Sequence, residues 1–204
     1  MEYKIQYRLN GFLWFGLGMV IDAVAGLFML LDLGYSYYFT FIGVSGAALI
    51  AEIIGVSLVG SYGRGFIWGR GFVITAAILK GLSYPLGIRG IMTGSTALMV
   101  FALAIDFASV IILMLGIYNY MNGAGALAEK NRDEKTGKRM TYAKKLYMGL
   151  VVCALVLGSF FASGRSTISG GIGMAAQMLL IIGAALVSLR LIQLAADYSG
   201  KEIK

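Results

Sequence analysis

The sequence predicts an all-α, polytopic integral membrane protein with six transmembrane helices. The chain has 204 residues, of which 59% are hydrophobic and 13% are charged, and its mean hydropathy is +0.82. It contains several apolar runs of about 20 residues, the length that crosses the hydrocarbon core of a bilayer as a helix. Such a composition is typical of a chain whose surface contacts lipid, so the lipid bilayer is its first expected partner.

Five apolar runs are long enough to span a membrane, and they lie near residues 10–31, 38–60, 91–118, 146–163 and 172–196. A further segment, 66–84, is ambiguous because it contains Arg70 and Lys80 and is followed by Pro85, so it also fits a re-entrant segment. The positive charges favour counting it as a span. Cytoplasmic loops are enriched in Lys and Arg, and only six spans place the basic N-terminal segment and the basic segment 121–145 on the same side.

With six spans, both termini are expected in the cytoplasm, and a prokaryotic plasma membrane is the expected location. The first span resembles a signal sequence, but its apolar core is too long and lacks a cleavage site, so we expect the chain to keep it. The chain is then one transmembrane domain, 1–204, with residues 121–145 as a basic cytoplasmic loop. This loop is most simply a solvated connector. The alternative is an amphipathic helix that lies on anionic lipid or docks a cytoplasmic partner.

The residue types on which many enzymes depend are scarce. The chain has no histidine and one cysteine, Cys153, which excludes an intrachain disulfide, histidine-ligated metal or haem, and histidine acting as a general base. We therefore expect no enzyme, no metal site and no cofactor. The net charge of +7 does not indicate nucleic acid, because seven of the 17 Lys and Arg residues lie in segment 121–145, where membrane orientation explains them.

Two carboxylates, Asp22 and Asp106, lie in the middle of long apolar segments. A charged side chain at the centre of a bilayer costs about 2.5–3.5 kcal/mol on insertion scales, so such residues usually face a cavity, a partner or a proton. We expect no basic residue at their depth, so each must be protonated, hydrogen-bonded or holding a cation. Ser109, one turn after Asp106, is a candidate third member of a proton- or cation-coupling site, and the hydroxyls of Thr93, Ser95 and Thr96 are further candidate ligands. The alternative is that both acids are neutral groups that pack helices together.

The other charges in the apolar segments have simpler explanations. Counting from the turn that joins the second and third spans, Glu52 and Arg70 reach similar depths on antiparallel neighbours and are expected to form a structural ion pair. Lys80 is expected near the outer side of the third span, where its side chain can snorkel to the surface. Arg64 and Trp68, together with Arg70, have the character of an interfacial anchor. A lipid headgroup held by these arginines and the neighbouring glycine amides is the alternative.

Repetition and glycine content add two further expectations. Ile21-Asp22 and Ile105-Asp106 are followed by similar apolar runs in spans of opposite direction, which raises the possibility of a three-plus-three inverted repeat, a construction common among transporters. The 29 glycines indicate close helix packing, within one chain or between copies and other membrane subunits. The function we expect is a small transporter or channel-like protein coupled to protons or cations. The alternative is a non-catalytic subunit of a larger membrane complex.

Overall fold

The computed structural model describes residues 2–29, 35–59, 63–163 and 167–198. These residues form six helices: α1 (Glu2–Met29), α2 (Tyr35–Val59), α3 (Arg64–Thr93), α4 (Thr96–Lys130), α5 (Glu134–Ser163) and α6 (Thr167–Tyr198). Helices α2 to α6 each contain a stretch that is long and apolar enough to cross a membrane, and α1 contains a shorter apolar stretch, Asn10–Ala25. The prediction of an all-α polytopic membrane protein is confirmed.

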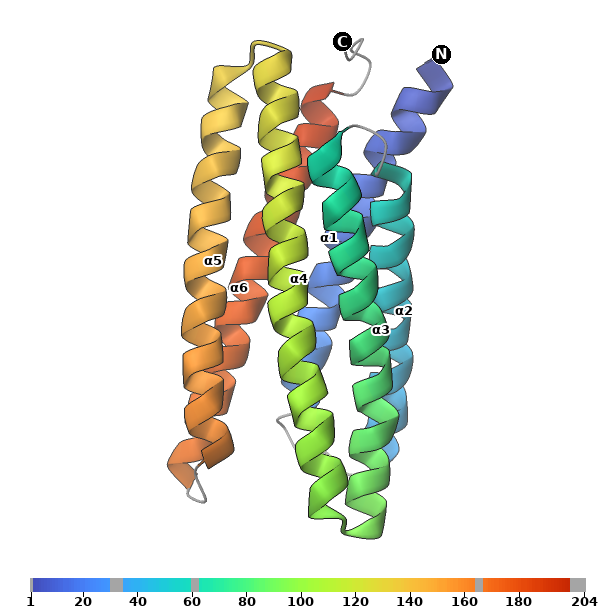
Figure 1. Cartoon of the computed structure of the whole chain (residues 1–204), viewed down its shortest axis with the longest axis vertical. Helices are drawn as coiled ribbons and strands as arrows, with labels where there is room; N and C mark the ends of the chain where they lie inside the picture. Colours follow the sequence, from blue (N-terminus) through green and yellow to red (C-terminus); the bar gives the residue numbers. More distant parts are fainter. Residues whose placement is uncertain (1, 30–34, 60–62, 164–166, 199–204) are drawn as a thin grey trace.

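The six helices form a closed ring in the order of the chain. Each helix packs against its neighbours in sequence, and α6 packs against α1 to complete the circle. Figure 1 shows the ring from the side, with α3, α4 and α5 in front of α1, α2 and α6. Because successive helices alternate in direction, α1 begins and α6 ends at the same end of the bundle. We call this the terminal end, and the end at which α3 turns into α4 the far end.

Segment 121–145 is not a loop, and this expectation was wrong. Helix α4 continues to Lys130 and α5 begins at Glu134, so three residues make the turn. The Asp133 side chain accepts a hydrogen bond of 3.0 Å from the backbone N–H of Thr136 and caps α5, while Arg132 adopts a left-handed conformation with φ of 59°. The basic residues therefore lie on a helical hairpin. Its two helices pack against each other, and Ala128 and Met140 are among their buried residues.

The third helix also differs from its expected length. Segment 66–84 was expected to end at Pro85, but α3 runs through this proline to Thr93. Proline removes one backbone hydrogen bond, yet membrane helices tolerate it because ending a helix in lipid would leave several backbone groups unpaired. The helix stops at Gly94, which has a φ of 65°, and Ser95 caps α4 by accepting from the N–H of Leu98.

The two halves of the ring are packed differently. Toward the terminal end, the rings of Phe12, Phe15, Phe66 and Tyr120 form a buried cluster, with centroid separations of 5.1–5.8 Å. The hydroxyl of Tyr120 donates a hydrogen bond of 2.9 Å to the carbonyl of Val56 and ties α4 to α2. We call these four rings the aromatic cluster. It fills the interior of the ring on that side.

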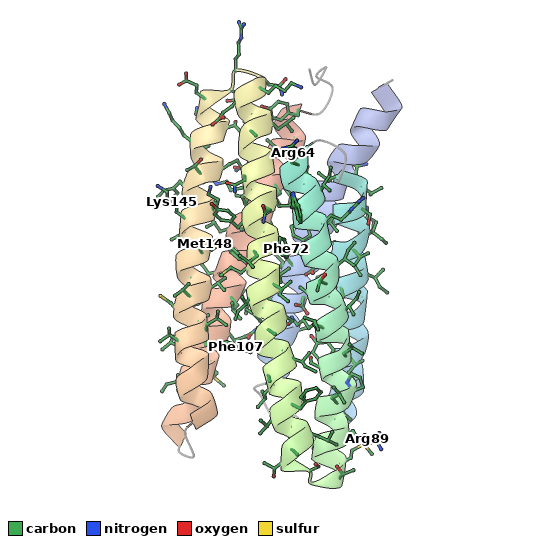
Figure 2. All side chains as sticks on the ribbon, in the orientation of Figure 1. Arg64, Phe72, Arg89, Phe107, Lys145 and Met148 are labelled. Carbon is green, nitrogen blue, oxygen red and sulfur yellow. The ribbon has the colours of Figure 1, made fainter. Side chains whose placement is uncertain are left out.

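The basic side chains also distinguish the two ends. In Figure 2, Arg64 and Lys145 lie in the half of the bundle near the terminal end, whereas Arg89 lies close to the far end. The hairpin of α4 and α5 adds six further basic residues to the terminal end: Lys130, Arg132, Lys135, Lys138, Arg139 and Lys144. This distribution agrees with the charge bias used to count six spans. That the terminal end faces the cytoplasm stays a prediction.

The inverted repeat also stays a prediction. Helices pack most extensively as three hairpins, α1 with α2, α3 with α4 and α5 with α6. A three-plus-three repeat would make the packing of α1 on α2 resemble that of α4 on α5, and the packing of α2 on α3 resemble that of α5 on α6. Neither pair of interfaces is alike in extent.

Glycine brings α1 and α2 into backbone contact. A Cβ atom added at Gly55 would collide with the backbone nitrogen of Phe15 and would lie 2.7 Å from the carbonyl oxygen of Gly11. Gly43, on the same helix, is exposed and has nothing within 4 Å of its Cβ position. Small residues at such crossings let membrane helices approach closely enough to gain van der Waals contact.

We expect Gly55→Ala to lower the free energy of unfolding by about 1–3 kcal/mol, because the added methyl group forces the two backbones apart. The measurement is unfolding of the purified protein in mixed micelles by SDS titration, followed by circular dichroism. Gly43→Ala on the same helix is the matched control and should be neutral or slightly stabilising. Equal effects of the two substitutions would contradict the close approach of α1 and α2.

Candidate functional site

A cavity of about 470 Å³ lies inside the ring. All six helices contribute to its walls, which are mainly apolar, and α3 and α4 contribute most of the lining. The side chains with polar groups in the lining are Asp22, Glu52, Lys80, Ser83, Tyr84, Asp106, Tyr147 and Gln177. The structure therefore brings both sequence-predicted acids, Asp22 on α1 and Asp106 on α4, to one site.

Asp22 is paired with a lysine that the sequence analysis placed elsewhere. The ammonium group of Lys80 forms an ion pair with Asp22, and the two side chains are 19% and 6% exposed. The hydroxyl of Tyr84 donates a longer hydrogen bond, 3.4 Å, to the other oxygen of Asp22. Two expectations were wrong: Lys80 does not point outward to the membrane surface, and a basic residue does lie at the depth of the acids.

A periodic signal in the sequence could have revealed Lys80. Ser83, Tyr84 and Gly87 follow Lys80 by three, four and seven residues, which places all four on one face of a helix. All four line the cavity. A polar stripe of this kind in an apolar helix indicates a face turned toward the interior of the bundle, because lipid cannot hydrogen-bond it.

Glu52 is the most deeply buried acid of the cavity, with an exposed fraction of 1%. Its Oε1 atom has no hydrogen-bond partner among the described residues. The expected ion pair with Arg70 does not form, because Glu52 faces the cavity while Arg70 makes no ion pair in the described part of the chain. The α1 backbone covers Glu52 closely: a Cβ atom added at Gly18 would lie 2.8 Å from its Cγ.

Asp106 lines the cavity without a direct partner. Within the described ranges, no hydrogen bond or ion pair involves its carboxyl group. Ser109 is buried, but its hydroxyl donates a hydrogen bond of 2.6 Å to the backbone carbonyl of Asp106 rather than to the carboxyl group. Ser109 also lies outside the cavity lining. The predicted pair of Asp106 and Ser109 is therefore a backbone contact within α4.

The other hydroxyls considered as cation ligands lie at the far end of the bundle. Thr93 donates to the carbonyl of Arg89, and Ser95 caps α4. These residues, and Thr96, are outside the cavity lining, and Asp106 is about 15 Å further along α4, at about 1.5 Å per residue. They stabilise the turn and do not complete an oxygen-rich site around the acids.

The cavity lining contains more carboxyl groups than ammonium groups. Three carboxyl groups and one ammonium group line the cavity, so two carboxyl groups remain after Lys80 pairs with Asp22. Isolated carboxylates are strongly disfavoured in an apolar interior, and they are tolerated there when they take up a proton or pair with a cation. Gln177 adds a neutral amide, which donates a hydrogen bond of 2.7 Å to the carbonyl of Ala23 and joins α6 to α1 beside Asp22.

The cavity reaches the surface toward the far end. Ile91 and Leu103 belong to its lining and are also exposed, at 38% and 60%. In Figure 1, α4 and α5 lie side by side at the terminal end and diverge toward the far end. In the other direction the buried aromatic cluster separates the cavity from the terminal end. Among the described residues, the lining therefore includes exposed side chains toward the far end, and the aromatic cluster lies between the cavity and the terminal end.

The residues considered for lipid-headgroup contact lie apart from this cavity. Arg64 and Trp68 are exposed near the terminal end of α3, and Arg70 is half-buried. The glycines between them do not form a loop: Gly65 and Gly69 lie within α3, where they pack against α4. Contact of these side chains with lipid headgroups stays a prediction, and the glycine-amide site for an anion is not supported.

Comparison with known proteins identifies no family: no protein-family model, no curated protein and no solved structure matches the chain. The functional argument therefore rests on the geometry of the cavity and on the chemistry of its side chains.

We expect Lys80→Met and Asp22→Asn each to destabilise the fold by about 3–5 kcal/mol, because removing one partner of a buried ion pair leaves the other charge unpaired. The double variant should lose less than the sum of the two, since both charges are then absent. SDS titration of all four proteins, followed by circular dichroism, measures this coupling. Additive effects would contradict the ion pair.

Proposed function

We propose that the protein is a small membrane transporter in which protons titrate carboxyl groups of the central cavity. The observation that carries this proposal is the excess of acid inside the ring: among the described residues, Glu52 and Asp106 have no direct partner, while Lys80 is paired with Asp22. Carboxyl groups in such surroundings change charge only by binding or releasing a proton or a cation. A cavity that alternates between charged and neutral states couples proton movement to the binding of a solute.

A proton fits the site better than a metal ion. Hard cations need about six or more oxygen ligands at short distances. In the part of the chain that the structure describes, no group of three Asp, Glu, Cys or His side chains is close enough to hold a metal. The hydroxyls that were expected to add oxygen ligands are bound to backbone groups instead. A proton requires only one carboxyl group at a time.

The packing supports access that alternates between the two sides. Among the described residues, exposed side chains line the cavity toward the far end, and the aromatic cluster fills the ring toward the terminal end. Movement of the three helix hairpins against one another would open the opposite side, because packing at each of the three junctions between hairpins is less extensive than packing within any hairpin. Rigid-body rocking of helix groups around a fixed site is the usual mechanism of such transporters.

We expect dicyclohexylcarbodiimide, which modifies protonated carboxyl groups, to label Asp106 more rapidly than Asp22. Among the described residues Asp106 has no direct partner, whereas Asp22 forms an ion pair with Lys80. Mass spectrometry of the purified protein across pH, with and without Na⁺, measures the labelling. It should fall as pH rises and should be indifferent to Na⁺. Protection of Asp106 from labelling by Na⁺ would indicate that the site binds a metal cation and would contradict the proton-titrating site. Absence of labelling at every pH would contradict a titrating site and favour a structural subunit.

A second test uses a cysteine in the cavity. Ala102 lines the cavity one helical turn from Asp106, and Cys153 is exposed on the outside of α5. We expect Ala102→Cys, in a Cys153→Ala background, to react with a membrane-impermeant methanethiosulfonate from both faces of oriented vesicles, faster from the far end. The natural chain is the control, because its thiol faces lipid and should not react with a charged reagent.

Reaction from one face alone would indicate a static pocket and would contradict alternating access. Absence of reaction from either face would indicate that the cavity is sealed, and a role as a packed subunit of a larger complex would replace the proposal.

A further inference from the structure

Asp106 and Glu52 lie at different depths in the cavity. At about 1.5 Å per residue, Asp106 lies about 15 Å from the far end of α4, and Glu52 lies about 25 Å from the far end of α2. Asp106 is thus closer to the far end than Glu52 is. A solute that enters from the far end reaches Asp106 before Glu52.

The lining next to Asp106 on α4 is apolar. Its neighbours in the lining on α4 are Ala102, Leu103, Val110 and Leu113. Toward the mouth the lining continues with Ile88, Ile91 and Met99. Such walls offer no ligands for a hydrated inorganic ion, but they bury hydrocarbon favourably. The two tyrosines of the lining, Tyr84 and Tyr147, add aromatic rings whose faces attract cations.

The size of the cavity sets the scale of the solute. A volume of about 470 Å³ falls in the range of about 300–1,000 Å³ that is typical of sites for small organic molecules. Leu103 and Ile91, which line this space toward the far end, are also exposed at the surface of the bundle. An amphipathic solute can therefore enter with its apolar part in contact with the walls.

We propose that the cavity binds monovalent organic cations with an apolar or aromatic body, and that Asp106 is their counter-charge. This inference rests on the proposed transporter function and names its substrate class. The cation takes the place of a proton on Asp106, and the proton is released to water. The other titratable or charged groups that line the cavity are Asp22, Glu52, Lys80, Tyr84 and Tyr147. Lys80 is paired with Asp22, so its positive charge attracts an anionic solute less than the other two carboxyl groups attract a cationic one.

Binding of phenyltrimethylammonium to the purified full-length protein tests the proposal. Isothermal titration calorimetry in buffers of different ionisation enthalpy gives the affinity and the number of protons released, which we expect to be about one. Benzenesulfonate, of similar size and opposite charge, should not bind. Asp106→Asn should weaken binding by about tenfold or more and abolish proton release, because the counter-charge is gone. Glu134→Gln removes an exposed acid outside the cavity and should change neither quantity.

A second measurement does not depend on the folding of the Asp106 variant. In the Ala102→Cys, Cys153→Ala protein, we compare the modification rates of a cationic and an anionic methanethiosulfonate, each relative to its rate with a small free thiol. The cationic reagent should react about tenfold faster or more, since Asp106 lies one turn away and attracts it. Equal rates, or faster reaction of the anionic reagent, would overturn the proposal.

The outcomes separate this inference from the transporter proposal. If Ala102→Cys reacts from both faces and Asp106 titrates, but phenyltrimethylammonium does not bind or benzenesulfonate binds equally well, the substrate class is wrong and transport remains supported. If binding is unaffected by Asp106→Asn, Asp106 is not the counter-charge and the inference fails. If the cysteine introduced by Ala102→Cys does not react from either face and carbodiimide does not label Asp106 at any pH, both proposals fail together.

Discussion

The need to neutralise charge inside an apolar ring governs this structure. In the part of the chain that the structure describes, Lys80 is the basic side chain that lines the cavity, and Asp22 binds it. That pair offsets part of the cost of burying charge, but Glu52 and Asp106 have no direct partner among the same residues. An interior that served stability alone would be expected to replace such acids by apolar residues. Their presence is the physical reason to look for a proton or a cationic solute in the cavity.

The two ends of the bundle are packed differently around these acids. Close glycine crossings, such as Gly55 against Phe15, draw α1 and α2 together, and the aromatic cluster fills the ring toward the terminal end. Toward the far end α4 and α5 diverge (Figure 1), and the cavity reaches exposed residues. A bundle that is dense at one end and hollow at the other can present its acids to one side of a membrane while excluding the other side.

The sequence identified the acids more readily than their partners. Asp22 and Asp106 stand out because a charge is rare in an apolar run, and both line the cavity. Lys80 was misplaced because depth alone was considered, and depth does not tell which face of α3 a long side chain occupies. Glu52 was paired with Arg70 for the same reason. The end of α3 and the segment 121–145 were misjudged because Pro85 and a run of charges interrupt hydropathy without interrupting a helix.

The sequence by itself determined the class of the protein, the number of long helices and the concentration of acids in lipid-depth segments. These follow from local properties: apolar length, composition and charge distribution. Tertiary structure decided which charges meet. Whether an acid is paired with Lys80 or faces the cavity alone depends on how six helices rotate about their axes and close into a ring. That rotation is set by contacts between residues far apart in the chain, such as Gln177 with Ala23 and Tyr120 with Val56, which no local pattern specifies.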